Sequence, residues 1–327
     1  MKNKKTILVT GGAGFIGSNY LNKFVPKYKY YLFINVDILT YAANLDNLKI
    51  GSLDNYRFEK VDIRDIKNLE RVFVKYNPTD IINFAAETHV DFSIKNPNIF
   101  VETNVNGANN LLLLAKKYNL NRFHQVSTDE VYGQLKNKKG KFKETDLLHP
   151  SSPYSASKAA ADLLVNAYNR TFGLNTVITR SSNNYGPNQD RSKLIPKFII
   201  NLLNNKKVPL YAKGDNIRDW IYVEDDIDAI DLVFHKGRAG EIYNIGSSHE
   251  KTNLEITKIL LNLLGKDESF IEYVPDRPGH DFRYALDTTK IQKELGWRPK
   301  YNFEEAIKKT VKFYKNCENF TYCPAIL

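Results

Sequence analysis

Short apolar runs alternate with longer amphipathic stretches along the first half of the chain. The runs are typical of buried β-strands, because each spans a few residues and ends at a glycine or a polar side chain; they cover residues 6–10, 31–36, 57–61, 81–84, 122–126 and 177–179. Helical segments separate them, among them residues 15–24, 106–118 and 155–171. Apolar strands alternating with helices predict a doubly wound α/β fold, in which helices cover both faces of a parallel sheet.

The pattern becomes irregular after about residue 183. Residues that favour turns and loops interrupt it, at Gly186, Pro187, Pro196, Pro209, Gly214, Pro275, Pro278 and Gly279. We therefore expect a sheet domain over residues 1–182 and a smaller, loop-rich lobe mainly over residues 183–327. The chain is expected to return to the sheet near 217–247, through strands at 217–223 and 242–245.

Composition excludes several classes of protein. Of 327 residues, 42% are hydrophobic and 26% are charged, which is typical of a globular chain. No apolar run approaches the roughly 20 residues that cross a bilayer, and the basic N-terminus lacks the apolar core of a signal peptide. We expect a cytoplasmic protein without a membrane partner. Cys317 and Cys323 have no Cys/His cluster beside them, so the sequence predicts free thiols and no metal site.

The chain is basic, with 47 Lys and Arg against 37 Asp and Glu and a net charge of +10. A basic protein can bind nucleic acid. Here the lysines are scattered along the whole chain, often beside asparagine, and no recognition motif accompanies them. The sequence therefore favours a compositional bias and predicts no nucleic-acid partner.

A glycine-rich turn follows the first strand and opens the first helix. Gly11, Gly14 and Gly17 let the backbone approach a pyrophosphate, and the helix N-terminus adds free N–H groups. Asp37 ends the second strand, where a carboxylate accepts hydrogen bonds from a ribose diol and repels a 2′-phosphate. The sequence thus predicts a Rossmann-type fold that binds NAD in preference to NADP. Asp62, after the third strand, either caps a helix or contacts the adenine, and both interpretations stay open.

Tyr154 and Lys158 are four residues apart, which places them on one face of a helix. A nearby ammonium group stabilises a phenolate, so we expect the pKa of Tyr154 to be lowered towards neutrality. Such a tyrosine can remove a hydroxyl proton while a hydride leaves the carbon. Two adjacent acids, Asp129 and Glu130, follow the fifth strand, and ligands of open α/β sheets bind at the carboxyl ends of strands. We expect both acids to face the nicotinamide side of the site.

These motifs resemble those of the extended short-chain dehydrogenases/reductases, and in particular of the nucleotide-sugar 4,6-dehydratases of the dTDP-glucose type. The glycine motif and the Tyr/Lys pair are shared by the whole superfamily, whereas the Thr-Asp-Glu triplet and the Arg-Pro-Gly-His segment are more specific. The similar stretches run nearly from end to end: 11–17, 37–45, 62–65, 85–91, 127–133, 154–158, 183–187, 193–196, 218–220 and 277–281. The resemblance also implies a homodimer joined through helices near 106–118 and 155–171.

The resemblance implies a reaction and a role for each catalytic residue. Tyr154, aided by Lys158 and Thr128, would remove the C4 hydroxyl proton as hydride passes to NAD. Glu130 would take the C5 proton, and Asp129 would protonate the C6 hydroxyl as water leaves. Return of the hydride to C6 would give a 4-keto-6-deoxy sugar on a route to 6-deoxysugars such as rhamnose.

The resemblance also assigns binding residues. On the cofactor side it implies contacts from Gly11, Gly14, Phe15, Ile16, Gly17, Asp37, Thr40, Asp62, Ile63, Ala85, Ala86, Thr88, Thr103, Tyr154, Lys158 and Asn184. On the substrate side it implies contacts from Thr88, Thr128, Asn183, Lys193, Leu194, Pro209, Tyr211, Arg218, Asn253, Arg277 and His280. The cationic members suit a diphosphate, because guanidinium groups bind phosphate oxygens bidentately.

Three positions depart from the pattern of that family: Phe92, the stretch Asp190–Ser192 and Phe282. The middle one precedes Lys193 and bears on the nucleotide-sugar pocket, so UDP-glucose stays open beside dTDP-glucose. Two other reactions on the same scaffold, 4-epimerisation and decarboxylation of a nucleotide sugar, are the alternatives. Epimerisation needs no C5 base, so Asp129 and Glu130 argue against it. A catalytically inactive NAD-binding regulator is another alternative. It would not need intact catalytic residues, so the presence of all of them argues against it.

Overall fold

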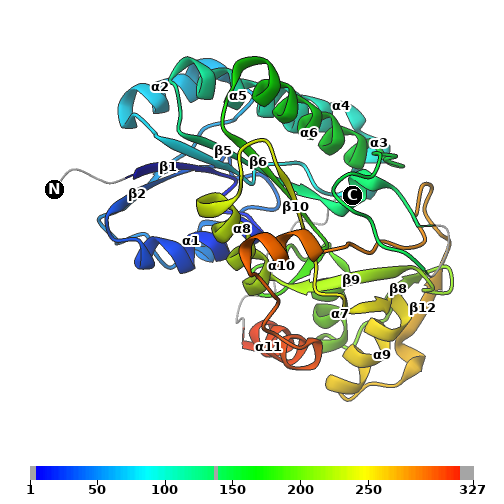
Figure 1. Ribbon diagram of the computed structural model, residues 1–327. Helices are drawn as coiled ribbons and strands as arrows, with labels where there is room; N and C mark the ends of the chain where they lie inside the picture. The colour runs from blue at the N-terminus through cyan, green and yellow to red at the C-terminus, as the bar shows by residue number, and fades with distance from the viewer. Residues whose placement is uncertain (1–4, 136–138, 317–327) are drawn as a thin grey trace.

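The computed structural model describes residues 5–135 and 139–316, so Cys317 and Cys323 lie outside the described residues. Within these residues, seven parallel strands form a central sheet in the order β10-β6-β5-β4-β1-β2-β3 (Figure 1). The strands are β1 (Lys5–Thr10), β2 (Tyr31–Val36), β3 (Tyr56–Glu59), β4 (Asp80–Asn83), β5 (Arg122–Thr128), β6 (Thr176–Ser181) and β10 (Ile242–Ile245). The predicted α/β architecture is confirmed.

Both faces of this sheet are buried, because successive side chains of a strand point to opposite sides. Ile7 and Val9 of β1 join one apolar cluster, whereas Leu8 joins another. The first cluster lies under α1 (Phe15–Lys27), α8 (Val223–Lys236) and α10 (Thr289–Leu295). The second lies under α2 (Ile66–Tyr76), α5 (Ala108–Lys117) and α6 (Pro153–Phe172). The two layers of helices are visible on opposite sides of the sheet in Figure 1.

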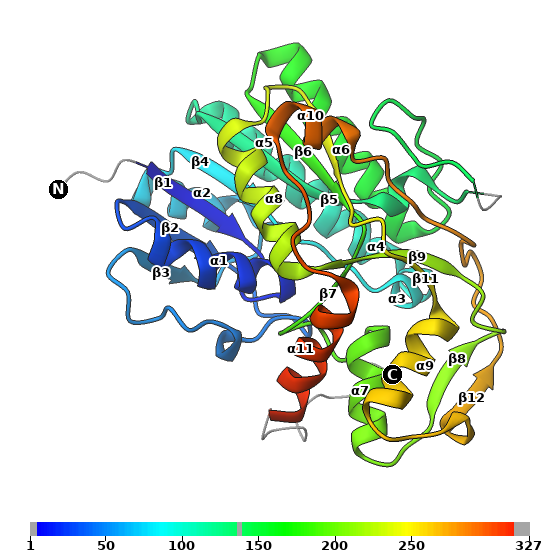
Figure 2. The same cartoon turned by 60° about the horizontal axis from the view of Figure 1, so that its bottom comes forward.

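A smaller lobe with its own apolar cluster lies beside the carboxyl ends of the strands (Figure 2). Its helices are α7 (Leu194–Leu203), α9 (Asn253–Leu263) and α11 (Phe303–Asn316). A two-stranded sheet pairs β8 (Val208–Tyr211) with β12 (Ile271–Val274). A three-stranded sheet has the order β11-β9-β7 and contains β7 (Asn183–Tyr185), β9 (Ile217–Tyr222) and β11 (Glu250–Thr252).

Of the two segments expected to return to the central sheet, only one does so. Residues 242–245 form β10 at its edge, next to β6. The expectation for 217–223 is wrong, because β9 pairs with β7 and β11 instead. In this position its polar side chains find partners on neighbouring loops: Arg218 donates to the Asp281 carbonyl (2.9 Å), and Asp219 accepts from the backbone N–H of His249 (3.0 Å).

The helix expected over 106–118 is also organised differently. Short helices α3 (Val90–Lys95) and α4 (Pro97–Phe100) lead into a π-helical stretch, Val101–Gly107, and α5 starts only at Ala108. The widened turn carries Asn104, whose amide donates to the Glu87 carbonyl (3.0 Å) and to Ser157 Oγ (2.8 Å). One buried side chain thus ties the loop after β4 to α6.

The start of α6 is fixed by local sequence. Ser152 and Ser155 form a reciprocal capping box, and Pro153 occupies the first helical turn, where its missing N–H costs no hydrogen bond. The helix ends at Gly173 in the left-handed conformation (φ 68°). These signals set the position of Tyr154 and Lys158 on the first two turns of the helix.

We expect Asp162→Ala to lower the free energy of unfolding by about 3–5 kcal/mol, since it leaves a buried guanidinium unpaired. Asp162 on α6 accepts from Arg180 Nε on β6 at 2.9 Å, and the two side chains are 0% and 3% exposed. Urea denaturation measures the change. The exposed Asp54→Ala is the control and should stay within about 0.5 kcal/mol of the parent; equal urea midpoints for the two variants would contradict the prediction.

No helix in the described part of the chain combines the length and apolar character needed to span a membrane.

Candidate functional site

The glycine-rich turn connects β1 to α1 and forms one end of a large cavity at the carboxyl ends of the strands. Gly11 has a positive φ of 69°, and a Cβ at that position would lie 2.7 Å from the Ala85 backbone. A Cβ on Gly17 would lie 2.4 Å from the Gly11 carbonyl oxygen. Glycine is therefore required at both positions, and the result is a helix N-terminus that opens onto the cavity with no side chain capping it. This is the geometry that accepts a pyrophosphate.

Asp37, at the end of β2, lines the same cavity and also braces the glycine turn. Its two carboxylate oxygens accept from the backbone N–H groups of Ala13 (3.0 Å) and Leu39 (2.8 Å). Burial raises the pKa of this carboxyl, and the two N–H groups oppose that rise. Each oxygen retains a lone pair for a ribose hydroxyl. The bracing role was not foreseen from the sequence.

Asp62 does not cap the following helix, so one of the two interpretations that the sequence left open is excluded. The N-cap of α2 is Asp65, which accepts from the N–H groups of Lys67 and Asn68. Asp62 instead forms an ion pair with Arg64 (Nη2 to Oδ2, 2.6 Å) and faces the cavity.

The cavity wall fits NAD on chemical grounds. Every residue assigned to the cofactor from the sequence lines it, from the glycine turn to Thr88, Thr103 and Asn184. Among the described residues, no hydrogen-bond partner is found for several buried polar atoms of this wall: Ser182 Oγ, Asn183 Oδ1 and Asn184 Oδ1. A glycine turn, a carboxylate at the end of β2 and unpaired polar atoms at the far end suit a long polar ligand such as a dinucleotide.

We expect Asp37→Ala to raise the dissociation constant of NAD by about 10- to 100-fold, which corresponds to the loss of charge-assisted hydrogen bonds. The affinity for NADP should fall much less, because the substitution also removes the charge that repels a 2′-phosphate. Fluorescence titration with both dinucleotides measures the effect, with the exposed Asp46→Ala as control. An equal loss for NAD and NADP would contradict this assignment of Asp37.

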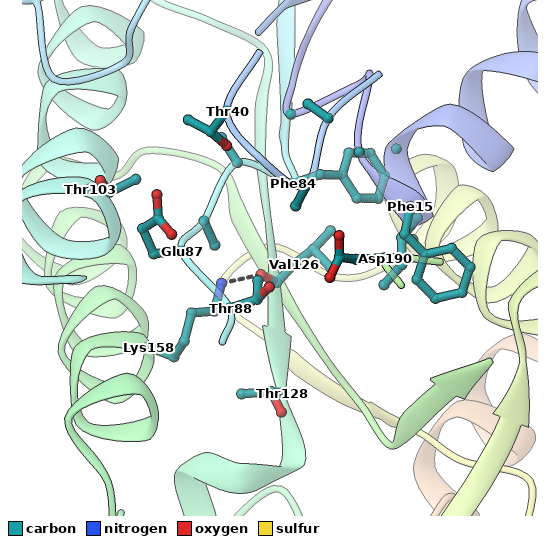
Figure 3. Close-up of a pocket in the computed structure, with 18 of the residues that line it drawn as sticks. Phe15, Thr40, Phe84, Glu87, Thr88, Thr103, Val126, Thr128, Lys158 and Asp190 are labelled. Atoms are coloured by element: carbon teal, nitrogen blue, oxygen red, sulfur yellow. Dashed lines mark hydrogen bonds between the residues drawn. The ribbon is translucent and has the colours of Figure 1, made fainter. Parts of the chain in front are cut away.

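The catalytic candidates meet at the opposite end of the cavity. Thr128 ends β5 and caps the 3₁₀-helix Asp129–Tyr132: its Oγ1 accepts from Glu130 N–H and donates to Asp129 Oδ1, both at 3.2 Å. Tyr154 and Lys158 come from α6, and Lys158 Nζ donates to the Val126 carbonyl at 2.8 Å (Figure 3). All five side chains line the cavity.

The expected lowering of the Tyr154 pKa is wrong for the residues present. Burial and the Glu130 carboxylate raise its pKa well above the usual value, and the interaction with the Thr128 hydroxyl only partly opposes them. Lys158 is not among the main influences on this pKa; burial lowers its own pKa to about 8, and its ammonium group donates to the Val126 carbonyl. The tyrosine therefore carries its proton in the protein itself.

The two acids lie in different electrostatic surroundings. Burial, and next the charge of Glu130, raise the pKa of Asp129 well above its usual range, and no partner is found for its Oδ2 among the described residues. Burial also raises the pKa of Glu130, but three cations oppose that rise: Arg277, Lys193 and Arg218. The arrangement favours a protonated Asp129 beside an ionised Glu130.

A second cavity adjoins the first and lies against the smaller lobe. Nine residues assigned to the substrate line it: Asn183, Lys193, Leu194, Pro209, Tyr211, Arg218, Asn253, Arg277 and His280. Thr88, assigned to both the cofactor and the substrate, lines the first cavity. So does Thr128, assigned to catalysis and to the substrate. Glu130, Asn183, Asp190 and Lys193 line both cavities, so the two are continuous.

The cations of the second cavity are held in place by different partners. Lys193 Nζ donates to the Thr88 carbonyl (2.7 Å), and Arg277 forms an ion pair with Asp91 (3.0 Å), which also accepts from the Tyr211 hydroxyl (3.3 Å). The Arg218 guanidinium is anchored by backbone carbonyls and stacks on the Tyr284 ring at 4.4 Å.

Sequence reasoning gave no role to several residues that the structure places in these walls. In the first cavity they are Phe84, Glu87 and Asp190; in the second they include Phe92, Lys95, Lys197 and Trp220. The sequence did offer signals for three of them. Glu87 lies within the stretch 85–91, which resembles the family, and Phe92 and Asp190 lie where the sequence departs from the family pattern. Among the described residues, no cluster of three or more His, Cys, Asp or Glu side chains could hold a metal ion.

Comparison with known proteins gives a consistent result. The family model for GDP-mannose 4,6 dehydratase matches residues 8–310. The dTDP-glucose 4,6-dehydratase of Haemophilus influenzae is 47% identical, covering 94% of this chain and 97% of that protein.

Two solved structures are equally similar. A dTDP-glucose 4,6-dehydratase from Bacillus anthracis in complex with NAD superposes with a TM-score of 0.90 at 48% identity, over 97% of this chain and 98% of that one. DesIV, a dTDP-glucose 4,6-dehydratase from Streptomyces venezuelae with NAD and the ligand TYD bound, gives 0.91 at 46% identity, over 95% and 97%. The chain therefore belongs to the nucleotide-sugar 4,6-dehydratase family of extended short-chain dehydrogenases/reductases.

Proposed function

We propose that the protein is an NAD-dependent dehydratase that converts dTDP-glucose to the 4-keto-6-deoxy sugar. The observation that carries this proposal is the position of Thr128, Asp129 and Glu130 opposite Tyr154 in one cavity. Oxidation at C4 needs a proton acceptor at the hydroxyl, and elimination across C5 and C6 needs a separate base and acid. Asp129 and Glu130 provide the acid and the base, which an epimerase or decarboxylase would leave without a task, and Tyr154 provides the acceptor when the positive charge of bound NAD stabilises its phenolate.

Bound NAD supplies a hydride acceptor and donor and, while oxidised, a positive charge near Tyr154. Tyr154 Oη exchanges the proton of the C4 hydroxyl, and Thr128 orients it by hydrogen bonding. Lys158, fixed on the Val126 carbonyl at 2.8 Å, supplies a buried positive charge on the same face of α6. We assign the binding of the dinucleotide to the residues of the first cavity, with the pyrophosphate at the N-terminus of α1 and the ribose at Asp37.

Glu130 and Asp129 divide the elimination between them. A ketone at C4 acidifies the C5 proton, and Glu130 takes it, because the neighbouring cations favour its ionised form. Asp129 gives its proton to the departing C6 hydroxyl, because burial holds this carboxyl in its acid form. The two carboxyl groups differ in protonation because their surroundings differ, and the titration of the pair is coupled.

The smaller lobe holds the nucleotide. Lys193, Arg218 and Arg277 face the second cavity and are the groups that we assign to the diphosphate. In this proposal residues 1–182, together with the returning strand β10, form the NAD-binding domain, and residues 183–327 mainly bind the nucleotide sugar. The names of the relatives favour a thymidine nucleotide over a uridine nucleotide.

Mass spectrometry of the purified protein incubated separately with dTDP-glucose and UDP-glucose tests the proposed function. A product lighter by one water, formed faster from dTDP-glucose, is the expected result. No loss of water from either substrate after NAD is added would refute dehydration. Faster reaction of UDP-glucose would keep the reaction and correct the nucleotide.

We also propose that the protein is a cytoplasmic homodimer joined through α5 and α6, and that it serves the synthesis of a 6-deoxysugar such as rhamnose. The dimer is supported by apolar side chains left exposed on these two packed helices, Leu113 (41%), Leu163 (61%) and Phe172 (48%). Sedimentation equilibrium tests it: the parent should have the mass of a dimer, and Leu163→Glu should lower that mass. A parent with the mass of a monomer would refute the dimer.

A further inference from the structure

The hexose of a nucleotide sugar must lie where the two cavities meet. Its C4 atom has to reach the cofactor in the first cavity, while its diphosphate and nucleoside extend into the second. The residues that line both cavities are Glu130, Asn183, Asp190 and Lys193. Glu130 is the proposed base, and Asn183 and Lys193 already have substrate roles. Asp190 has none, although it lies at the same junction.

The Asp190 carboxylate is held in a defined orientation. Its Oδ1 accepts from the backbone N–H of Ser192 at 3.0 Å and from the Ser192 hydroxyl, and its own carbonyl accepts from Lys193 N–H at 3.1 Å. In the part of the chain that the structure describes, no donor reaches Oδ2. Figure 3 shows the Asp190 side chain between Val126 and Phe15 in this view of the first cavity. One oxygen thus anchors the group, and the other is left for a ligand at the junction.

The chemistry of an anchored carboxylate limits what it can bind there. An ionised carboxylate only accepts hydrogen bonds, so its partner must be a donor. A phosphate group would be repelled, which excludes the diphosphate as that partner. Sugar hydroxyls are neutral donors, and a hydrogen bond from a hydroxyl to a carboxylate is short and strong because the acceptor is charged.

We propose that Asp190 is a specificity-determining residue that accepts a hydrogen bond from a ring hydroxyl of the hexose, at C2 or C3. The other positions are excluded by the reaction, because C1 carries the diphosphate, C4 is oxidised and C6 loses its hydroxyl. This inference rests on the proposed function for the identity of the sugar. Asp190 touches substrate in this proposal but takes no part in proton transfer.

Binding measurements on Asp190→Ala test the proposal without turnover. Isothermal titration should show the affinity for dTDP-glucose reduced about 10- to 100-fold, while the affinity for dTDP alone and for NAD is unchanged. One of the two analogues, dTDP-2-deoxyglucose or dTDP-3-deoxyglucose, should bind to the variant and to the parent with equal affinity. That analogue identifies the hydroxyl.

A matched control carries the same change of charge away from the site. Asp215 is exposed in the smaller lobe and lines neither cavity, so Asp215→Ala should leave the affinities for all of these ligands unchanged. Asp190→Asn, which keeps the shape but loses the charge, should fall between the parent and Asp190→Ala. Thermal melting shows that each variant is folded.

Three results would overturn the proposal: an unchanged affinity of Asp190→Ala for dTDP-glucose, an equal loss for dTDP, or a loss for NAD in its place. The last would assign Asp190 to the cofactor. Failure of the proposed function is seen separately, in the parent protein, as binding of dTDP-glucose without loss of water.

Discussion

Tyr154→Phe is expected to lower kcat for dehydration by about 10²- to 10⁴-fold, the usual contribution of a positioned acid–base group. The variant removes only the hydroxyl that exchanges a proton with C4. The ring remains packed edge-on against Phe100, with centroids 6.3 Å apart, in a small apolar cluster with Val90. Substrate affinity should therefore change only a few-fold. Steady-state kinetics together with titration of dTDP-glucose separate the two effects.

Tyr168→Phe is the matched control for this experiment. Tyr168 lies on the same helix, and its hydroxyl donates to Asn109 at 3.1 Å, away from both cavities. Loss of this hydroxyl should leave kcat within about twofold of the parent, since one hydrogen bond contributes about 1 kcal/mol to stability and nothing to the reaction. If Tyr154→Phe retained the kcat of this control, Tyr154 would not be the group that exchanges the proton.

Glu130→Gln is expected to abolish water elimination, with a fall in rate of about 10²- to 10⁴-fold. The amide fills the same space but cannot accept the C5 proton. In heavy water the parent should place deuterium at C5, and the variant should place none in either product or recovered substrate. Mass spectrometry and proton NMR of the recovered sugar measure this.

Asp129→Asn makes a comparison at the neighbouring position. It removes the acid and keeps the base, so the C5 proton still leaves but the C6 hydroxyl departs poorly. Recovered substrate should then carry deuterium at C5 without loss of water. The two variants thus stop the elimination at different stages. Deuterium incorporation by Glu130→Gln at the rate of the parent would contradict the assignment of Glu130 as the base.

Much of the central fold follows from local patterns. The apolar runs that form β1, β2, β4, β5 and β6 lie within two residues of their predicted bounds. Burial on both faces of a strand requires a continuous apolar run, which is visible without any tertiary information. The third strand, expected over 57–61, spans Tyr56–Glu59 and lies within the same margin.

The candidate site could be assembled from sequence because its parts are local motifs. The glycine turn, Asp37 at a strand end, the Thr-Asp-Glu triplet and the Tyr/Lys pair each need only a few adjacent residues. A parallel sheet brings the carboxyl ends of all strands to one edge, so motifs at strand ends must meet there.

The sequence by itself thus determined the fold class, the dinucleotide turn and which side chains gather at the edge of the sheet, because each depends on spacing within one segment. Only the tertiary structure decided the protonation of the site. The pKa values of Tyr154 and Asp129 rise mainly because burial, which several segments of the chain produce together, disfavours their charged forms. The pairing of β9 and the placement of Asp190 at the junction of two cavities also depend on contacts between segments far apart in the chain. Solvent exclusion and charge act through space, which no local pattern records.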